Sequence, residues 1–204
     1  MRKTKDNELI VIHDPLTLRT TKYLGFVNKM TLDKVKTLKI KSTQEIPTLR
    51  ELIELTGNKI RLLCEMKVRG IADLLVKILE QMNAIKSTLI ISFKHDELHK
   101  IQKLKPDIQV GYLEPRGLGW LFEPLLTNRI IKKAKLHSIN LINIHKWFLK
   151  KSLVERAHQN GIKVFTWTIN SEKQLKKALN KGVDGVLTNF VTEIQSFLEN
   201  VKIS

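Results

Sequence analysis

The sequence has a single cysteine, few aromatic residues and no long apolar run. Cys64 is the only cysteine among 204 residues, so no disulfide can form within the chain, and its place in the run IRLLCEM predicts a buried, reduced thiol. No apolar stretch reaches the roughly 18 residues that a membrane span requires. The opening MRKTKDNE lacks the apolar segment of a secretory signal. We therefore expect no membrane span and a cytoplasmic location.

Acidic residues are also scarce relative to basic ones. Lys and Arg number 36 against 20 Asp and Glu, which gives a net charge of +16. Such a charge suits a nucleic acid, an anionic membrane face or a phosphorylated small molecule. The lysines are spread along the whole chain with few aromatics between them, whereas single-strand-binding surfaces interleave basic residues with stacking ones. The pattern predicts a solvated lysine surface and disfavours nucleic acid as a partner.

Past residue 47 the sequence alternates short apolar runs with amphipathic segments. The runs are of strand length and show little polar alternation, which is typical of strands covered on both faces; they span 60–67, 88–93, 107–113, 137–143, 162–169 and 184–189. Helices are predicted between them, over 71–84, 95–104, 121–135, 149–160 and 171–181. Thr48 with Glu51 predicts a capping box, and Ser171 predicts an N-cap.

Six strands, each followed by a helical segment, predict an α/β fold with a parallel sheet, either doubly wound or a barrel. No Gly-x-Gly-x-x-Gly follows a first strand, as a dinucleotide-binding sheet would require. Polar residues recur at the carboxyl ends of successive strands, where a (β/α)8 barrel builds its active site; they are Glu65, Lys67, Ser92, Glu114, Asn143, Trp167, Asn170 and Asn189. We therefore expect a TIM-type barrel in a single domain over 1–204. The stretch 14–47 is predicted as an excursion with one short charged helix and no strand.

Five motifs, in order and spacing, resemble those of the glycerophosphodiester phosphodiesterases. They are VIHDPLTLRTT (11–21), IPTLRELIEL (46–55), CEMK (64–67), LIISFKHDEL (89–98) and VFTWTINSEKQLKKALNKGVDGVLTN (164–189). The resemblance covers essentially the whole chain. It implies a TIM barrel that hydrolyses glycerophosphodiesters to glycerol 3-phosphate and an alcohol, with a divalent cation, Mg²⁺ or Ca²⁺, and two histidines.

The resemblance places four site residues in this sequence. His13 matches a catalytic histidine, Glu65 a metal-binding glutamate, Lys67 a lysine near the substrate phosphate, and Trp167 a tryptophan that walls the pocket. The residue types suit the chemistry, since a cation and an ammonium offset charge on the phosphodiester while a histidine moves a proton near neutral pH. Taken singly, each also has an ordinary structural explanation: a hydrogen-bonded histidine, a surface ion pair or a core tryptophan.

The family pattern begins before position 1 of this sequence. It includes a first strand ending in His-Arg-Gly, a Pro-Glu-Asn-Thr helix start and a second strand ending in Glu-x-Asp, all ahead of the turn that TKDN (4–7) matches. We therefore expect an incomplete barrel that lacks the first βα unit and the second strand, with open strand edges through which the chain could self-associate. We also expect a metal bound weakly or not at all by this chain alone, because hard cations take several oxygen ligands.

Two main interpretations stay open on the sequence, beside a third, a nucleic-acid-binding protein, which only the net charge of +16 indicates. One is a phosphodiesterase impaired by its missing segment; the other is a non-catalytic, degenerate barrel that binds a phosphorylated ligand or a partner chain. The leaving alcohol is not specified, because the loops after later strands would select it and LEPRGLGWLFEP (113–124) is the segment least like the family.

Overall fold

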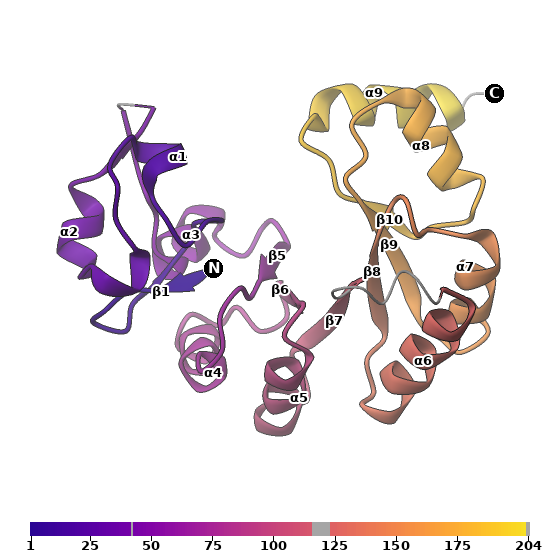
Figure 1. Cartoon of the computed structure of the whole chain (residues 1–204), viewed down its shortest axis with the longest axis horizontal. Helices are drawn as coiled ribbons and strands as arrows, with labels where there is room; N and C mark the ends of the chain where they lie inside the picture. Colours follow the sequence, from indigo (N-terminus) through magenta and orange to yellow (C-terminus); the bar gives the residue numbers. More distant parts are fainter. Residues whose placement is uncertain (42, 116–122, 203–204) are drawn as a thin grey trace. The chain divides into compact units, whose positions relative to one another are not determined.

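A computed structural model describes residues 1–41, 43–115 and 123–202 of the chain. The described part of the loop 113–124 is therefore confined to its two ends. The chain divides into two compact units, Met1–Gln109 and Val110–Ser204. Figure 1 labels most of their helices and strands, and its colours run from indigo at the N-terminus to yellow at the C-terminus. Among the described residues, no helix is long and apolar enough to cross a membrane.

The first unit opens with short elements that are held around a small apolar core of their own. In order they are β1 (Arg2–Lys3), β2 (Leu9–Ile10), α1 (Leu18–Thr21), the 3-10 helix η1 (Val27–Lys29), α2 (Leu32–Lys36), β3 (Lys39–Ile40) and β4 (Gln44–Glu45). The core residues are Ile10, Ile12, Val27, Met30, Val35, Leu38 and Ile46. The predicted charged helix is α2. The prediction of no strand between 14 and 47 was wrong, because β3 and β4 pair antiparallel there. Two-residue strands leave too little alternation to be detected in a sequence.

The rest of the first unit follows the predicted alternation. Its elements are α3 (Leu49–Thr56), β5 (Leu62–Glu65), α4 (Ala72–Gln81), β6 (Thr88–Ser92) and α5 (His95–Leu104). β5 and β6 pair parallel, and α4 and α5 pack against one another. The capping box that Thr48 and Glu51 predict begins α3: Glu51 N–H donates to Thr48 Oγ1 at 3.1 Å and Thr48 N–H to Glu51 Oε2 at 2.7 Å.

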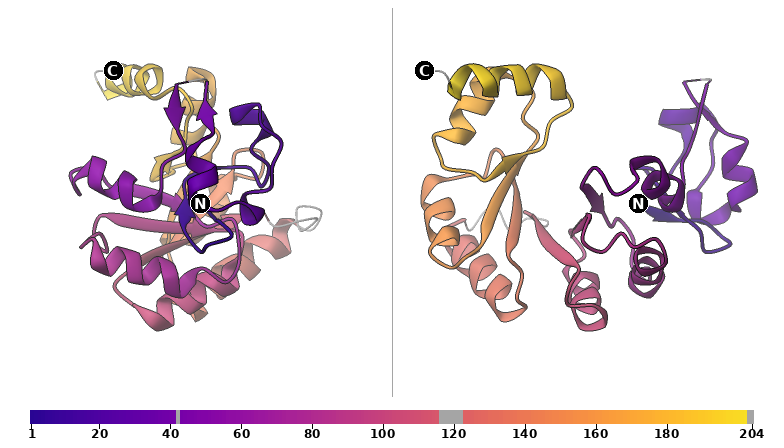
Figure 2. Two further views of the ribbon diagram at one scale, coloured as in Figure 1. Left: turned by 90° about the vertical axis from the view of Figure 1, so that its left-hand side faces the viewer. Right: turned by 180° about the vertical axis from the view of Figure 1, so that it is seen from behind.

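The second unit contains four strands and four helices among the described residues. In order they are β7 (Gln109–Glu114), α6 (Glu123–Leu136), β8 (Leu141–His145), α7 (Lys151–His158), β9 (Lys163–Trp167), α8 (Glu172–Leu179), β10 (Gly185–Val186) and α9 (Val191–Lys202). The first residue of β7 is also the last residue of the first unit. β7, β8, β9 and β10 pair parallel in sequence order. α6 packs against α7 and α8 against α9, as the view from behind in Figure 2 also shows. In neither unit does the strand order reverse, which argues against a doubly wound sheet.

Candidate active site

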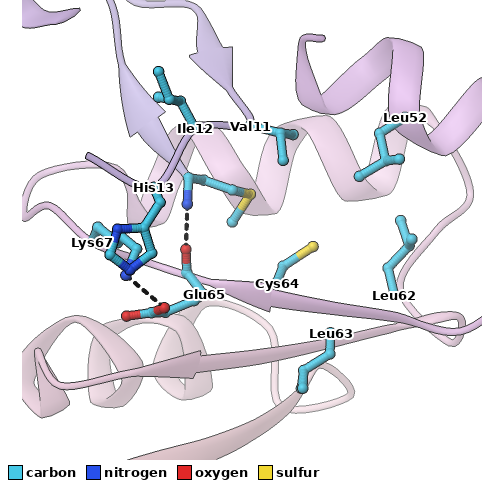
Figure 3. A pocket seen from close by; sticks show the side chains of 10 residues that line it. Val11, Ile12, His13, Leu52, Leu62, Leu63, Cys64, Glu65 and Lys67 are labelled. Carbon is cyan, nitrogen blue, oxygen red and sulfur yellow. Dashed lines mark hydrogen bonds and ion pairs between the residues drawn. The ribbon is translucent and has the colours of Figure 1, made fainter. Parts of the chain in front are cut away.

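A pocket of about 230 Å³ lies in the first unit, beside the outer edge of β5 (Figure 3). Its lining residues are Met1, Val11, Ile12, His13, Leu52, Leu62, Leu63, Cys64, Glu65 and Lys67. Three of the four predicted site residues, His13, Glu65 and Lys67, therefore line one pocket. The fourth, Trp167, belongs to the second unit.

β5 brings the two charged residues of the pocket together. Glu65 is the last residue of this strand, and Lys67 follows two positions later, so both side chains lie on one side of the extended backbone. Lys67 Nζ donates to Glu65 Oε2 at 2.7 Å, with the lysine side chain 14% and the glutamate side chain 26% exposed. The pair is therefore shielded from solvent on most sides but open to the pocket. An anion that enters would meet an ammonium whose present partner is a carboxylate.

His13 reaches the pocket from the segment that follows β2. Its ring Nδ1 lies 2.6 Å from Asp14 Oδ1, and Arg19 Nε donates to Asp14 Oδ2 at 2.5 Å. Arg19 and His13 lower the pKa of the Asp14 carboxyl to about 2, with the hydrogen bond from Arg19 the larger cause. A carboxylate at Nδ1 favours the tautomer with the proton on that nitrogen. Nε2 is then the ring nitrogen that can accept a proton.

Asp14 and Arg19 are functional candidates that the sequence reasoning did not single out. Both stand inside the motif VIHDPLTLRTT. The sequence could have indicated Asp14, because its carboxylate is adjacent to His13. The contact between Arg19 and Asp14 could not be read from the sequence, because it depends on how α1 is positioned. Arg2 adds a further restraint, since its Nε donates to the backbone oxygen of His13 at 2.9 Å.

Cys64 lines the same pocket but contributes apolar surface. It is a free cysteine, 5% exposed, as the sequence predicts. Burial raises the pKa of its thiol to about 11, so the sulfur is protonated at neutral pH. A protonated thiol is a poor nucleophile and a poor metal ligand. Cys64 is therefore part of the pocket wall and not of its chemistry.

Metal-ligating side chains are not clustered around Glu65 in the described part of the chain. Within 1–41, 43–115 and 123–202, no three His, Cys, Asp or Glu side chains come together as a metal site. Glu65 is the carboxylate of the pocket, and it is already paired with Lys67. Magnesium and calcium bind about six or more oxygen ligands. The predicted metal role of Glu65 thus lacks partners among these residues.

Trp167 ends β9 and packs against an aromatic group in the second unit. Its ring lies 4.7 Å, centroid to centroid, from that of His145, and the Trp147 ring lies 4.8 Å from His145 on another side, both edge to face. Trp167 Nε1 donates to the backbone oxygen of Asn143 at 3.4 Å. Burial, helped by the charge of Lys146, lowers the pKa of His145. His145 and Trp147 were missed by the sequence reasoning, because the motif INIHKW has no counterpart among the five motifs.

Two other polar groups at the strand ends have structural roles, whereas the prediction that Asn143 lies at a strand end was wrong. Ser92 is buried, and its hydroxyl donates to Met66 O at 2.6 Å. Asn170 Oδ1 accepts the N–H of Asn189 at 3.1 Å, which joins the loops after β9 and β10. Asn143 is in the middle of β8 and fully buried, and its side-chain amide has no hydrogen-bond partner among the described residues.

Residues 1–193 match the sequence profile of the glycerophosphoryl diester phosphodiesterase family. The chain belongs to this family. Its phosphodiesterase relatives include the glycerophosphodiester phosphodiesterase of Caldanaerobacter subterraneus, which is 33% identical over 202 residues covering 91% of this chain and 78% of the relative. Another is the enzyme of that name from Bacillus altitudinis, 27% identical over 98% of this chain and 84% of the relative.

Solved phosphodiesterase structures share the fold. An Oleispira antarctica phosphodiesterase in complex with the product sn-glycerol-3-phosphate superposes with a TM-score of 0.83 at 25% identity, covering 97% of this chain and 82% of that one. A glycerophosphodiester phosphodiesterase from Parabacteroides distasonis gives a TM-score of 0.83 at 24% identity over 98% of this chain and 82% of that one. The chain therefore has the TIM-barrel-like α/β fold of this family, as its sequence predicts.

Proposed function

We propose that this protein hydrolyses glycerophosphodiesters to glycerol 3-phosphate and an alcohol. Membership of the family supports this activity, and so does the product bound by the Oleispira antarctica relative. The observation that carries the proposal within this chain is that His13, Glu65 and Lys67 line one pocket.

Each of the three residues has a role in that reaction. His13 Nε2 moves a proton at the attacking water or at the leaving alcohol, with Nδ1 held by Asp14. The Lys67 ammonium binds a phosphate oxygen and offsets the negative charge that grows in the transition state. Glu65 holds Lys67 in place through their 2.7 Å contact. For Trp167, which ends β9 in the second unit, the role of an apolar wall for the substrate stays a prediction from the family resemblance.

The proposal includes a divalent cation, and it includes an incomplete set of ligands for that cation among residues 1–204. Glu65 would be one ligand for Mg²⁺ or Ca²⁺, in keeping with the family resemblance, and its carboxylate would then be shared between the cation and Lys67. The described residues supply no set of three ligands around it. We therefore propose that a polypeptide of residues 1–204 alone is impaired. Loss of the charge stabilisation that a bound metal supplies costs roughly several kcal/mol in the transition state.

The test is release of glycerol 3-phosphate from glycerophosphocholine at saturating Mg²⁺ or Ca²⁺. Residues 1–204 should give no measurable turnover. A chimera that carries the corresponding N-terminal segment of the Caldanaerobacter subterraneus enzyme ahead of Met1 should be active. Clear metal-dependent turnover by residues 1–204 alone would overturn the proposed impairment while leaving the activity itself established.

The active chimera then tests the residues. His13→Ala should abolish turnover, and Lys67→Ala should raise KM and lower kcat. His158→Ala is the matched control, because His158 also contacts a carboxylate, Asp184 at 2.8 Å, but does not line the pocket. If His13→Ala and His158→Ala reduce turnover equally, His13 is not the proton-transfer group.

A binding function without turnover is the second candidate, and Lys67 is the observation that favours it. Its ammonium faces the pocket whether or not a metal site is complete. In that case residues 1–204 should bind glycerol 3-phosphate weakly, Lys67→Ala should remove the binding, and the chimera should show no turnover.

We also propose that the outer edge of β5 accepts another chain. On that edge Met1 makes two backbone hydrogen bonds, to Glu65 O at 2.5 Å and from Lys67 N at 3.3 Å, and within the described residues no strand pairs there. Half-exposed Leu63 continues the edge. Sedimentation velocity over a range of concentrations should reveal a dimer, and a strictly monomeric protein would exclude one.

A further inference from the structure

The segment 16–26 forms a closed loop that directly follows the candidate active site. Its neck is an antiparallel bridge between Leu16 and Phe26. Inside the loop the fully buried Thr17 donates its hydroxyl to the backbone oxygen of Tyr23 at 2.6 Å. Backbone and hydroxyl hydrogen bonds therefore hold this loop in shape.

Those side chains point to solvent. The exposed fractions are 50% for Leu18, 43% for Tyr23, 67% for Leu24 and 55% for Phe26, and α1 buries none of its residues. We call these four residues the exposed apolar group. Apolar side chains scattered singly over a surface are ordinary, but four within nine residues on a pre-formed loop mark a contact surface.

Basic residues outnumber acidic ones around this loop. Between residues 15 and 41 there are seven basic residues and one acidic residue: Arg19, Lys22, Lys29, Lys34, Lys36, Lys39 and Lys41 against Asp33. Arg19, Lys36 and Lys39 are paired with Asp14, Glu51 and Glu45, so the other lysines carry the excess positive charge. Lys22 and Lys29 are exposed. Lys34 lies over the Tyr23 ring, with Nζ 4.6 Å from its centroid. Lysines that flank exposed leucine, phenylalanine and tyrosine are the composition that binds the interface of an anionic bilayer.

We propose that the 16–26 loop docks onto an anionic phospholipid surface. The exposed apolar group enters the boundary between headgroups and acyl chains, and the surrounding lysines contact the lipid phosphates. Nucleic acid would use the lysines but gives no reason for four exposed apolar side chains. Docking also acts on the candidate site, because Arg19 of this loop holds Asp14, the partner of His13. Docking itself does not depend on the proposed hydrolysis.

The experiment is co-sedimentation of the 204-residue protein with vesicles of phosphatidylglycerol and phosphatidylcholine in equal amounts, and with vesicles of phosphatidylcholine alone. Binding is expected to the anionic vesicles and to weaken as salt is added, because screening shortens the range of the lysine charges to about 10 Å at 0.1 M. Leu24→Ser/Phe26→Ser should weaken partitioning by at least about tenfold. Lys22→Glu/Lys29→Glu should weaken it by about fivefold or more per position.

Leu55→Ser is the matched control for the apolar variants, since Leu55 is 84% exposed on α3, outside the loop. It should leave vesicle binding unchanged. A fluorophore at Leu24→Cys reports insertion directly, because the natural thiol of Cys64 is buried; its emission should shift to the blue with anionic vesicles. The same label at Leu55→Cys should not respond.

Three results would overturn the proposal. The first is a protein that does not sediment with the anionic vesicles. The second is binding that the Leu24→Ser/Phe26→Ser variant retains in full, which would leave only a general attraction of lysines. The third is a parent protein that self-associates, ignores vesicles and becomes monomeric in the double variant, which would make the exposed apolar group an interface between copies.

Discussion

Two adjacent carboxylates at the start of α5 hold the segment between β5 and α4, and we predict that they contribute very unequally to stability. Glu97 is 8% exposed and accepts two backbone N–H groups, Gly70 at 3.0 Å and Ile71 at 3.4 Å. Asp96 binds the exposed Arg69 side chain through two hydrogen bonds of 2.7 and 3.0 Å. The first contact is shielded from water and the second is not.

Glu97→Ala should lower the free energy of unfolding by about 2–4 kcal/mol. It leaves two N–H groups at the start of α4 without their acceptor, and a hydrogen bond to a charged group contributes roughly 1.5–3 kcal/mol. Asp96→Ala should cost at most about 1 kcal/mol, because an exposed ion pair is screened by solvent. Glu97→Gln keeps one acceptor oxygen and should fall between the two, at about 1–2 kcal/mol.

Urea unfolding at pH 7 measures these differences in unfolding free energy. The midpoint urea concentration should shift, whereas the slope of the free energy against urea concentration should stay the same. Hydrogen exchange of the Gly70 and Ile71 amides gives a local reading, and only the Glu97 variants should accelerate it. If Asp96→Ala and Glu97→Ala lowered the free energy of unfolding equally, the reasoning would be refuted, because burial of the acceptor would then make no difference to stability.

Thr48→Ala should cost about 1 kcal/mol of unfolding free energy, measured with urea, because it removes the acceptor of the capping box at the start of α3. Gly111→Ala should cost about 1–3 kcal/mol in the same assay, because the added methyl would lie 2.8 Å from Leu141 Cδ2 and 3.0 Å from its Cγ. Cys64 should resist iodoacetamide at pH 8 until the protein is unfolded, since a thiol with a pKa of about 11 is ionised in only about one molecule in a thousand. The Asp14 carboxyl should titrate near pH 2 in an NMR experiment. Because its pKa is depressed from 3.8, the stability that its charged form contributes is present above pH 3.8 and is lost as pH falls through about 2.

Local sequence patterns predicted most of the secondary structure. Helices α4 to α8 and the longer strands beyond residue 47 were predicted from apolar runs and periodicity, and their observed bounds lie within a few residues of the predicted ones. The start of α3 was predicted by its capping box alone, and α9 was not predicted. Ser171 caps α8 as predicted, accepting the N–H of Gln174 at 3.4 Å. Gly161 and Gly182 follow α7 and α8 with φ of 68° and 81°, which side chains larger than glycine's adopt with strain. Each of these features depends on residues a few positions apart, so a sequence displays it directly.

The sequence by itself determined the family and pointed to His13, Glu65, Lys67 and Trp167 as site residues. Sequence motifs consist of residue types at fixed spacing, and the amino-acid sequence contains both. Only the tertiary structure decided what these side chains contact. It paired Lys67 with Glu65, set Asp14 and Arg19 behind His13, and placed His145 against Trp167. It also left the exposed apolar group of the 16–26 loop in solvent, although a sequence would assign such residues to a core. These outcomes depend on the direction in which each side chain points, on contacts between segments such as β8 and β9, or on which face of a loop turns outward. Charge pairing and burial are therefore settled only when the backbone has folded.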